Sequence, residues 1–175
     1  LYAPTFRDTN RFSRETPIVW DKLNDLLVTN STTLLIKLHR HDYSMVMRKT
    51  FSNIRVLDNE SDMYPLFSKI DLLITDYSSI FFDFLLTDKP ILFYPYDKNT
   101  YLTQDRSMYD DYNTVTPGHK AYNFEEFYEK LELFFSQPES LKKSDLSYDS
   151  IKEMYNKYSD SNGAKRTYEF ITANL

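Results

Sequence analysis

Short apolar runs alternate with segments of helical spacing along this chain, and this alternation constrains its fold more than any other feature. The apolar runs have the length of single β-strands and occupy residues 32–38, 54–57, 71–75 and 90–94. Helical patterns lie between or before them, at residues 20–27, 43–49, 63–68 and 79–86. Parallel strands need a crossover, and crossover helices cover the sheet. The order therefore predicts an α/β fold, a Rossmann-like parallel sheet flanked by helices.

The two ends of the chain differ from this pattern. Residues 1–4 resemble the tail of a further strand that is cut short, so we expect more chain before them. Helical patterns at 124–135, 150–158 and 164–173, punctuated by Pro138 and Gly163, predict a helical C-terminal extension. We expect a single domain over residues 1–175, with an α/β core in 1–123 and a helical part in 124–175.

Composition excludes several classes of function. The 41% hydrophobic and 17% aromatic residues indicate a globular domain. A formal net charge of -5 offers no basic field for nucleic acid, which we exclude as a partner. The absence of cysteine excludes disulfides and thiolate metal sites and fits a reducing compartment. We expect neither a leader peptide nor a transmembrane span, so any membrane contact is peripheral.

The polar turn after the third apolar run is the sharpest candidate site. The run ends at Thr75, Asp76, Tyr77, Ser78 and Ser79 follow, and a helix opens at residue 80. In open parallel sheets, ligands bind beyond the carboxyl ends of strands, and a helix start with free N–H groups favours phosphate. The alternative is an ordinary turn with a capping serine. With two glycines in the chain, no glycine-rich phosphate loop is present.

His39 ends the first of the four runs and is a candidate catalytic residue. At the carboxyl edge of a strand it would face the same crevice as Ser78, where an imidazole can donate to a phosphate oxygen. A loop histidine without a role is the alternative. His39 and His41 lack a third ligand of suitable spacing, so we expect no metal site and no cofactor.

The segment 94–111 after the fourth run is a long loop by its pattern, and long loops in compact domains are usually functional or mobile. Its Arg106 could clamp a diphosphate through a planar fork of donors. Its Asp111 could accept from a ribose or polyol hydroxyl. A solvated surface loop would carry similar residues, and that alternative stays open.

Several stretches resemble, in order and spacing, the C-terminal domain of the CDP-glycerol glycerophosphotransferases, which include teichoic acid polymerases and primases and related capsule enzymes. They are YAPTFRD from residue 2, IKLH from 36, DLLITDYSSIFFDF from 71, KPILFYPYD from 89, the 101–109 segment, TPG from 116 and YNKYSDSNGAKR from 155. The resemblance covers nearly the whole chain.

The resemblance implies the C-terminal half of a two-domain GT-B architecture, with the donor nucleotide bound mainly to this half. His39 matches the family histidine that acts on the transferred phosphate, Thr75 to Ser79 match the donor phosphate turn, and Arg106 and Asp111 match a pair on the loop that closes over the donor. Arg40 and Ser107 depart from residues common in the family, which bears on donor identity.

The implied partners are a CDP-glycerol or CDP-ribitol donor, a polyol-phosphate or saccharide polymer acceptor, and an N-terminal domain of the same protein that this chain lacks. The expected location is the cytoplasm, at the inner face of the bacterial membrane. Two other interpretations remain: a glycosyltransferase of GT-B architecture that uses a nucleotide sugar, and a non-catalytic nucleotide-binding scaffold. The rarity of glycine argues against the glycosyltransferase.

Overall fold

A six-stranded sheet forms the centre of the computed structural model, which describes residues 1–7, 16–39, 50–58, 60–141 and 147–174. The strand order is β3-β2-β1-β4-β5-β6, and all five pairings are parallel. The strands are β1 (Tyr2–Ala3), β2 (Leu34–Ile36), β3 (Ile54–Val56), β4 (Leu73–Thr75), β5 (Ile91–Phe93) and β6 (His119–Lys120). This is the doubly wound order of Rossmann folds, and it confirms the predicted fold class.

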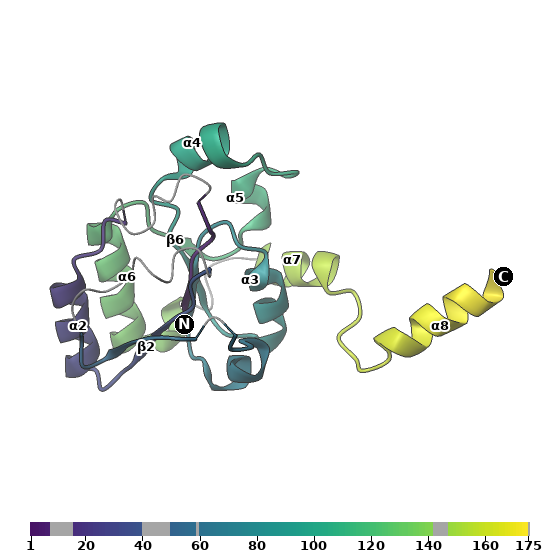
Figure 1. Ribbon diagram of the computed structural model, residues 1–175, viewed down its shortest axis with the longest axis horizontal. Helices are drawn as coiled ribbons and strands as arrows, with labels where there is room; N and C mark the ends of the chain where they lie inside the picture. The colour runs from purple at the N-terminus through teal and green to yellow at the C-terminus, as the bar shows by residue number, and fades with distance from the viewer. Residues whose placement is uncertain (8–15, 40–49, 59, 142–146, 175) are drawn as a thin grey trace.

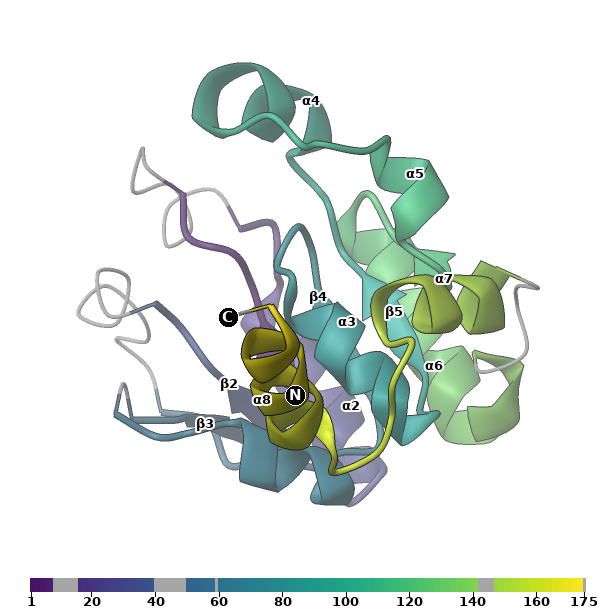
Figure 2. The ribbon, with the colours of Figure 1, turned by 90° about the vertical axis from the view of Figure 1, so that its right-hand side faces the viewer.

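Helices cover both faces of the sheet (Figures 1 and 2). One face carries α2 (Trp20–Thr29) and α6 (Phe124–Ser136). The other carries η2 (Tyr64–Lys69), α3 (Ile80–Phe84) with the 3-10 turn η3 (Leu85–Thr87), and α7 (Ser147–Tyr155). Both faces of the strands are therefore buried, as a parallel sheet requires.

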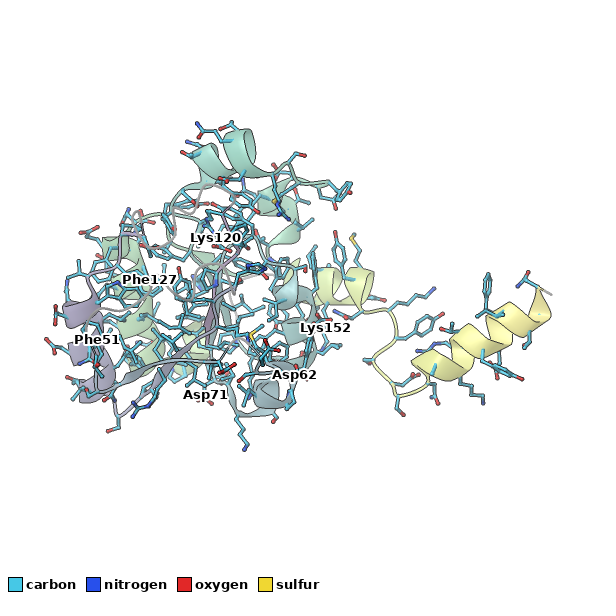
Figure 3. All side chains as sticks on the ribbon, viewed as in Figure 1. Phe51, Asp62, Asp71, Lys120, Phe127 and Lys152 are labelled. Atoms are coloured by element: carbon cyan, nitrogen blue, oxygen red, sulfur yellow. The ribbon has the colours of Figure 1, made fainter. Side chains whose placement is uncertain are left out.

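The two faces form two separate hydrophobic cores, and successive strand residues alternate between them. In β4, Leu73 belongs to the core under α3, whereas Ile74 belongs to the core under α2 and α6. Phe127 lies on α6 and points into the second of these cores (Figure 3). The period-2 alternation explains why the strands read as continuous apolar runs, since neither face is exposed to water.

The four predicted strands are confirmed, each as a shorter pairing inside its predicted run. The elements η2 and β6 differ from the predictions. The predicted helix at 63–68 is a 3-10 helix, with Pro65 in its first turn. Strand β6 was not predicted, because two residues leave no apolar run to detect. The predicted helix at 43–49 lies outside the described residues.

The segment after β5 is helical over part of its length, so the prediction of one long loop was wrong. It contains α4 (Lys98–Thr100) and a π-helical turn, η4 (Tyr101–Asp105), and α5 (Tyr112–Val115) follows shortly after it. Tyr101 is buried in η4, whereas the residues around it are at least partly exposed. A single buried residue gives no helical periodicity, so the sequence pattern could not reveal these short turns.

The predicted C-terminal helices are present but differ in their packing. Helix α6 belongs to one core, and Ile151 of α7 is buried in the other core, which also contains residues of α3 and η3. Helix α8 (Gly163–Ala173), reached after η5 (Pro138–Ser140) and α7, projects away from the rest of the chain and buries none of its residues (Figure 1). Among the described residues, no helix combines the length and the hydropathy that crossing a bilayer requires.

Candidate functional site

The carboxyl edge of the sheet gathers the ends of its four central strands. Tyr2 is in register with Ile36 of β2 and with Ile74 of β4, and Thr75 is in register with Phe93 of β5. Because all these strands are parallel, the segments that follow them leave the sheet at the same edge. Helices α4 and α5 lie over this edge (Figure 2). Thr75 ends β4, and the other predicted site residues are in segments that follow these strands.

The first two residues of the predicted phosphate turn are buried and serve the structure. The Thr75 hydroxyl donates to the Ala3 carbonyl at 2.8 Å. One carboxylate oxygen of Asp76 accepts from the backbone N–H groups of Thr5, at 2.8 Å, and Tyr77, at 2.6 Å. Both residues are fully buried, and these hydrogen bonds hold the start of the turn against the segment that follows β1.

The last two residues of the turn present hydroxyls. Ser79 is exposed and occupies the N-cap position of α3. Its hydroxyl makes no capping hydrogen bond to a described backbone N–H group. Ser78 is half-buried, and its Oγ lies 3.5 Å from the backbone nitrogen of Ile80, a long contact. The predicted capping role is therefore weak, and both hydroxyls are available to a ligand.

Arg7 organises this edge, and sequence reasoning did not identify it as a site residue. Its guanidinium is fully buried and donates from Nη1 to Asp76 at 2.7 Å and to the Thr5 carbonyl. Nε and Nη2 donate to the two carboxylate oxygens of Asp97, each at 2.9 Å. Burial lowers the pKa of Arg7, but the carboxylates, Asp76 first, raise it by more, so the side chain stays charged. An arginine in the segment that follows a strand, with aspartates in the segments that follow two other strands, was the available signal.

Tyrosines surround this ion cluster. The Tyr77 hydroxyl donates to Asp97 at 2.9 Å, and the Tyr77 ring stacks on Tyr101 with centroids 3.9 Å apart. Burial first, then the charge of Asp97, raise the pKa of Tyr77, which keeps its phenol protonated as a donor. The Tyr112 hydroxyl donates to the Asp76 carbonyl at 3.1 Å. The turn after β4 is thus joined to both η4 and α5.

Arg106 follows η4 directly, and its backbone N–H donates to the Tyr101 carbonyl at 3.1 Å. Its side chain is exposed. Burial raises the pKa of Tyr101, Asp76 raises it further, and Arg7 and Arg106 oppose that rise. Arg106 therefore follows the segment whose Tyr101 ring stacks on Tyr77 of the predicted turn.

Asp111 is exposed and occupies the N-cap of α5. Its carboxylate accepts from the backbone N–H groups of Asn113, at 2.9 Å, and Thr114, at 3.2 Å. This capping engages Oδ1 and leaves Oδ2 for a ligand hydroxyl. Because α5 also carries Tyr112, the cap helps to fix the hydrogen bond to Asp76 described above.

His39 lies three residues beyond the end of β2 and is exposed. Its ring contacts Phe6, with centroids 4.8 Å apart, and Phe6 precedes the buried Arg7. Each of His39, Thr5 and Tyr77 lies three residues beyond a residue of one paired row of the sheet, Ile36, Tyr2 and Ile74, so the three positions are at the same height above the sheet edge. Two strand spacings separate β2 from β4, which is about 10 Å. The structure therefore brings the imidazole, the turn and Arg106 to one edge. His41 lies outside the described residues.

A cavity of about 540 Å³ lies at the opposite, amino edge of the sheet. Leu1, Leu34 and Leu72 line it at the starts of their strands, together with Asp71, which Figure 3 shows at that edge. Its lining is mostly apolar, and it includes none of the predicted site residues. Ligands of doubly wound sheets bind at the carboxyl edge, so we assign the candidate site there. The described residues contain no cluster of three or more His, Asp or Glu suited to a metal ion.

Comparison with known proteins decides the family. Residues 1–173 match the family described as CDP-Glycerol:Poly(glycerophosphate) glycerophosphotransferase. The chain belongs to this family. It is 35% identical over 175 residues to the teichoic acid glycerol-phosphate primase of Bacillus subtilis strain 168, which covers 98% of this chain and 42% of that protein. A teichoic acid ribitol-phosphate primase of Bacillus spizizenii is 32% identical over 120 residues, 67% of this chain and 31% of that protein.

A solved structure supports the fold of this family member. The wall teichoic acid polymerase TagF matches with a TM-score of 0.76 and 24% identity, over 99% of this chain and 42% of that chain. At this identity the match establishes the fold and no more. The chain spans about two fifths of its first relatives. The predicted family and fold are confirmed.

Proposed function

We propose that this chain is the donor-binding, C-terminal half of a GT-B glycerophosphotransferase, a single domain with its α/β core in 1–123 and its helical part in 124–175. The donor is CDP-glycerol or CDP-ribitol, and the acceptor is a teichoic acid or related envelope polymer. The family match over residues 1–173 carries this proposal. The relatives include both glycerol-phosphate and ribitol-phosphate primases.

In this proposal the donor diphosphate lies at the carboxyl edge of the sheet, against the Tyr77–Ser79 turn. The hydroxyls of Ser78 and Ser79 donate to phosphate oxygens, and the backbone of Thr75 and Asp76 shapes the turn. Arg106 adds a planar fork of donors from the other side. Asp111 accepts from a ribose or polyol hydroxyl through the carboxylate oxygen that its capping bonds leave available.

His39 is the proposed catalytic residue. An acceptor hydroxyl attacks the phosphorus nearest the polyol, the bond from that phosphorus to the CMP oxygen breaks, and CMP leaves. His39 hydrogen-bonds the phosphate oxygens as negative charge develops on them and can protonate the leaving phosphate. Phosphoryl transfer depends mainly on such positioning and charge stabilisation.

The proton of the attacking hydroxyl goes to a base on the N-terminal domain of the whole protein. This chain alone should therefore bind donor without turning it over. The whole protein would act in the cytoplasm at the inner membrane face, where its polymer acceptor is anchored, and any contact with that membrane would be peripheral.

Isothermal titration calorimetry of the purified chain tests the proposal. We expect CDP-glycerol or CDP-ribitol to bind at least about tenfold more tightly than a UDP-sugar, a difference of about 1.4 kcal/mol. Equal affinity for cytidine and uridine nucleotides would remove the proposed donor. Absence of all nucleotide binding would favour the scaffold interpretation.

A further inference from the structure

We propose that Arg7 is a positioning residue of the donor site, which holds the turn after β4 and the helical segment after β5 in one fixed arrangement. The inference rests on the proposed function, because it concerns the same site. Arg7 itself does not contact the donor. Its side chain is fully buried, and within the described part of the chain its side-chain hydrogen bonds go to Thr5, Asp76 and Asp97.

The hydrogen bonds of Arg7 join segments that are far apart in the sequence. Asp76 is 69 residues from Arg7 and Asp97 is 90 residues away. Asp97 immediately precedes α4, and Asp76 immediately follows β4. The bidentate contact to Asp97 fixes orientation as well as distance, since both carboxylate oxygens meet separate nitrogens of a planar group. One side chain therefore sets the relative position of two walls of the proposed site.

Three aromatic rings complete the environment of Arg7. Its Cζ lies 5.2 Å from the ring centroids of Tyr77 and Tyr101 and 5.5 Å from that of Tyr96. These distances are within the range of cation–π attraction. Tyr77 belongs to the turn and Tyr101 to η4, and the two rings also stack on each other. Loss of the guanidinium would remove the group around which they are arranged.

Charge adds a second reason for an arginine at this position. One guanidinium beside two carboxylates gives the cluster a formal charge of -1. Without Arg7 the formal charge would be -2, directly beneath the place proposed for a diphosphate. A lysine would restore the charge but not the geometry, because an ammonium cannot present the fork that meets both oxygens of Asp97 and also reaches Asp76.

The segment that Arg7 holds also carries Arg106. Residues 98–105 form α4 and η4 without interruption, and Arg106 closes η4 with its backbone N–H. Release of Asp97 would free the start of this helical segment, and the position of Arg106 would then vary. Arg7 thus acts on the donor through Arg106 and through the turn.

The Arg7→Lys variant tests this inference, with Arg55→Lys on the exposed position of β3 as matched control. Trypsin cleaves after lysine and arginine, and the segment that Arg7 holds through Asp97 contains two such residues, Lys98 and Arg106. We expect folded Arg7→Lys to be cut after Lys98 or Arg106 at least about tenfold faster than wild type, and to bind CDP-glycerol at least about tenfold more weakly. Arg55→Lys should match wild type in both assays.

Binding is measured at a temperature at which circular dichroism shows each variant to be fully folded, so that lost affinity reflects the site and not global unfolding. If Arg7→Lys does not fold, Tyr77→Phe replaces it, since this variant removes only the hydroxyl that donates to Asp97. A folded variant with wild-type cleavage and wild-type affinity would overturn the inference. The cleavage assay needs no ligand. Failure of the wild-type chain to bind any cytidine nucleotide would instead overturn the proposed function.

Discussion

Both carboxylate oxygens of Asp97 accept a hydrogen bond from Arg7, from Nη2 to Oδ1 and from Nε to Oδ2, each at 2.9 Å. The two residues follow β1 and β5, which flank β4 on either side. The contact therefore passes over the end of β4, where the proposed phosphate turn begins. Together with the bond from Arg7 to Asp76, it links the segments that follow three neighbouring strands.

Arg106→Ala should weaken binding of CDP-glycerol by this chain about 10- to 100-fold. A charged hydrogen bond contributes about 1.5–3 kcal/mol, and each 1.4 kcal/mol is a factor of ten. Arg55→Ala is the matched control, because this arginine is exposed on the edge strand β3. Calorimetry of both variants makes the comparison. Equal affinities would remove Arg106 from the site.

His39→Asn should lower phosphate transfer without a comparable loss of donor affinity. General acid catalysis contributes about 10²- to 10⁴-fold, so we expect a loss in turnover of that order. Turnover is measured as CMP release by the two-domain protein, and affinity by calorimetry on this chain. A variant with unchanged turnover would show that the imidazole at the end of β2 has no catalytic role.

Gly118→Ala should destabilise the fold by about 1–3 kcal/mol. Gly118 has a φ of 111°, and an added Cβ would lie 2.9 Å from the Ile91 carbonyl oxygen. Gly163→Ala is the control, since a Cβ there meets nothing within 4 Å and Gly163 opens helix α8. It should be neutral or slightly stabilising. Urea denaturation of the two variants gives the free energies of unfolding. Equal effects at the two positions would contradict the constraint at Gly118.

His119 should make the fold less stable in acid. Burial first, then the charges of Lys130 and Lys120, hold its pKa below the ordinary 6.5, against a raising contact with the Ser140 carbonyl. The imidazole of His119 therefore binds a proton more readily in the unfolded chain than in the folded one. The free energy of unfolding is unaffected by this protonation above about pH 6.5 and decreases as the pH falls below that value. His119→Gln should lack this part of the pH dependence. The readout is the difference in unfolding free energy between wild type and variant at pH 7.5 and pH 5.5, and a constant difference would contradict the assignment.

Much of this fold could be predicted because the sheet is buried on both faces. Residues 71–75 and 90–94 read as continuous apolar runs, and such runs with helices between them fit few architectures. The polar turn after Thr75 stood out for the same reason, since polar residues interrupt an apolar pattern there. His39 was found as a side chain at a strand end. The structure places both at one edge of the sheet.

The contacts of Arg7 could not be predicted from local pattern. An arginine after a strand is usually solvated, and only the tertiary fold shows that this one is buried between two aspartates. Asp76 was predicted as a ligand-binding residue, and its side chain instead pairs with Arg7. The turn η4 and the short helix α5 were missed because they pack on Tyr77 and Asp76, which a local sequence window does not contain.

The central claim is that a cytidine diphosphate donor binds at the carboxyl edge of the sheet, against the turn that follows β4. Titration of ¹⁵N-labelled chain with CDP-glycerol, followed by amide chemical shifts, tests it most directly. We predict saturable shifts at Tyr77, Ser78, Ser79 and Arg106. Shifts confined to residues of the opposite cavity, such as Leu34 and Leu72, would contradict the claim.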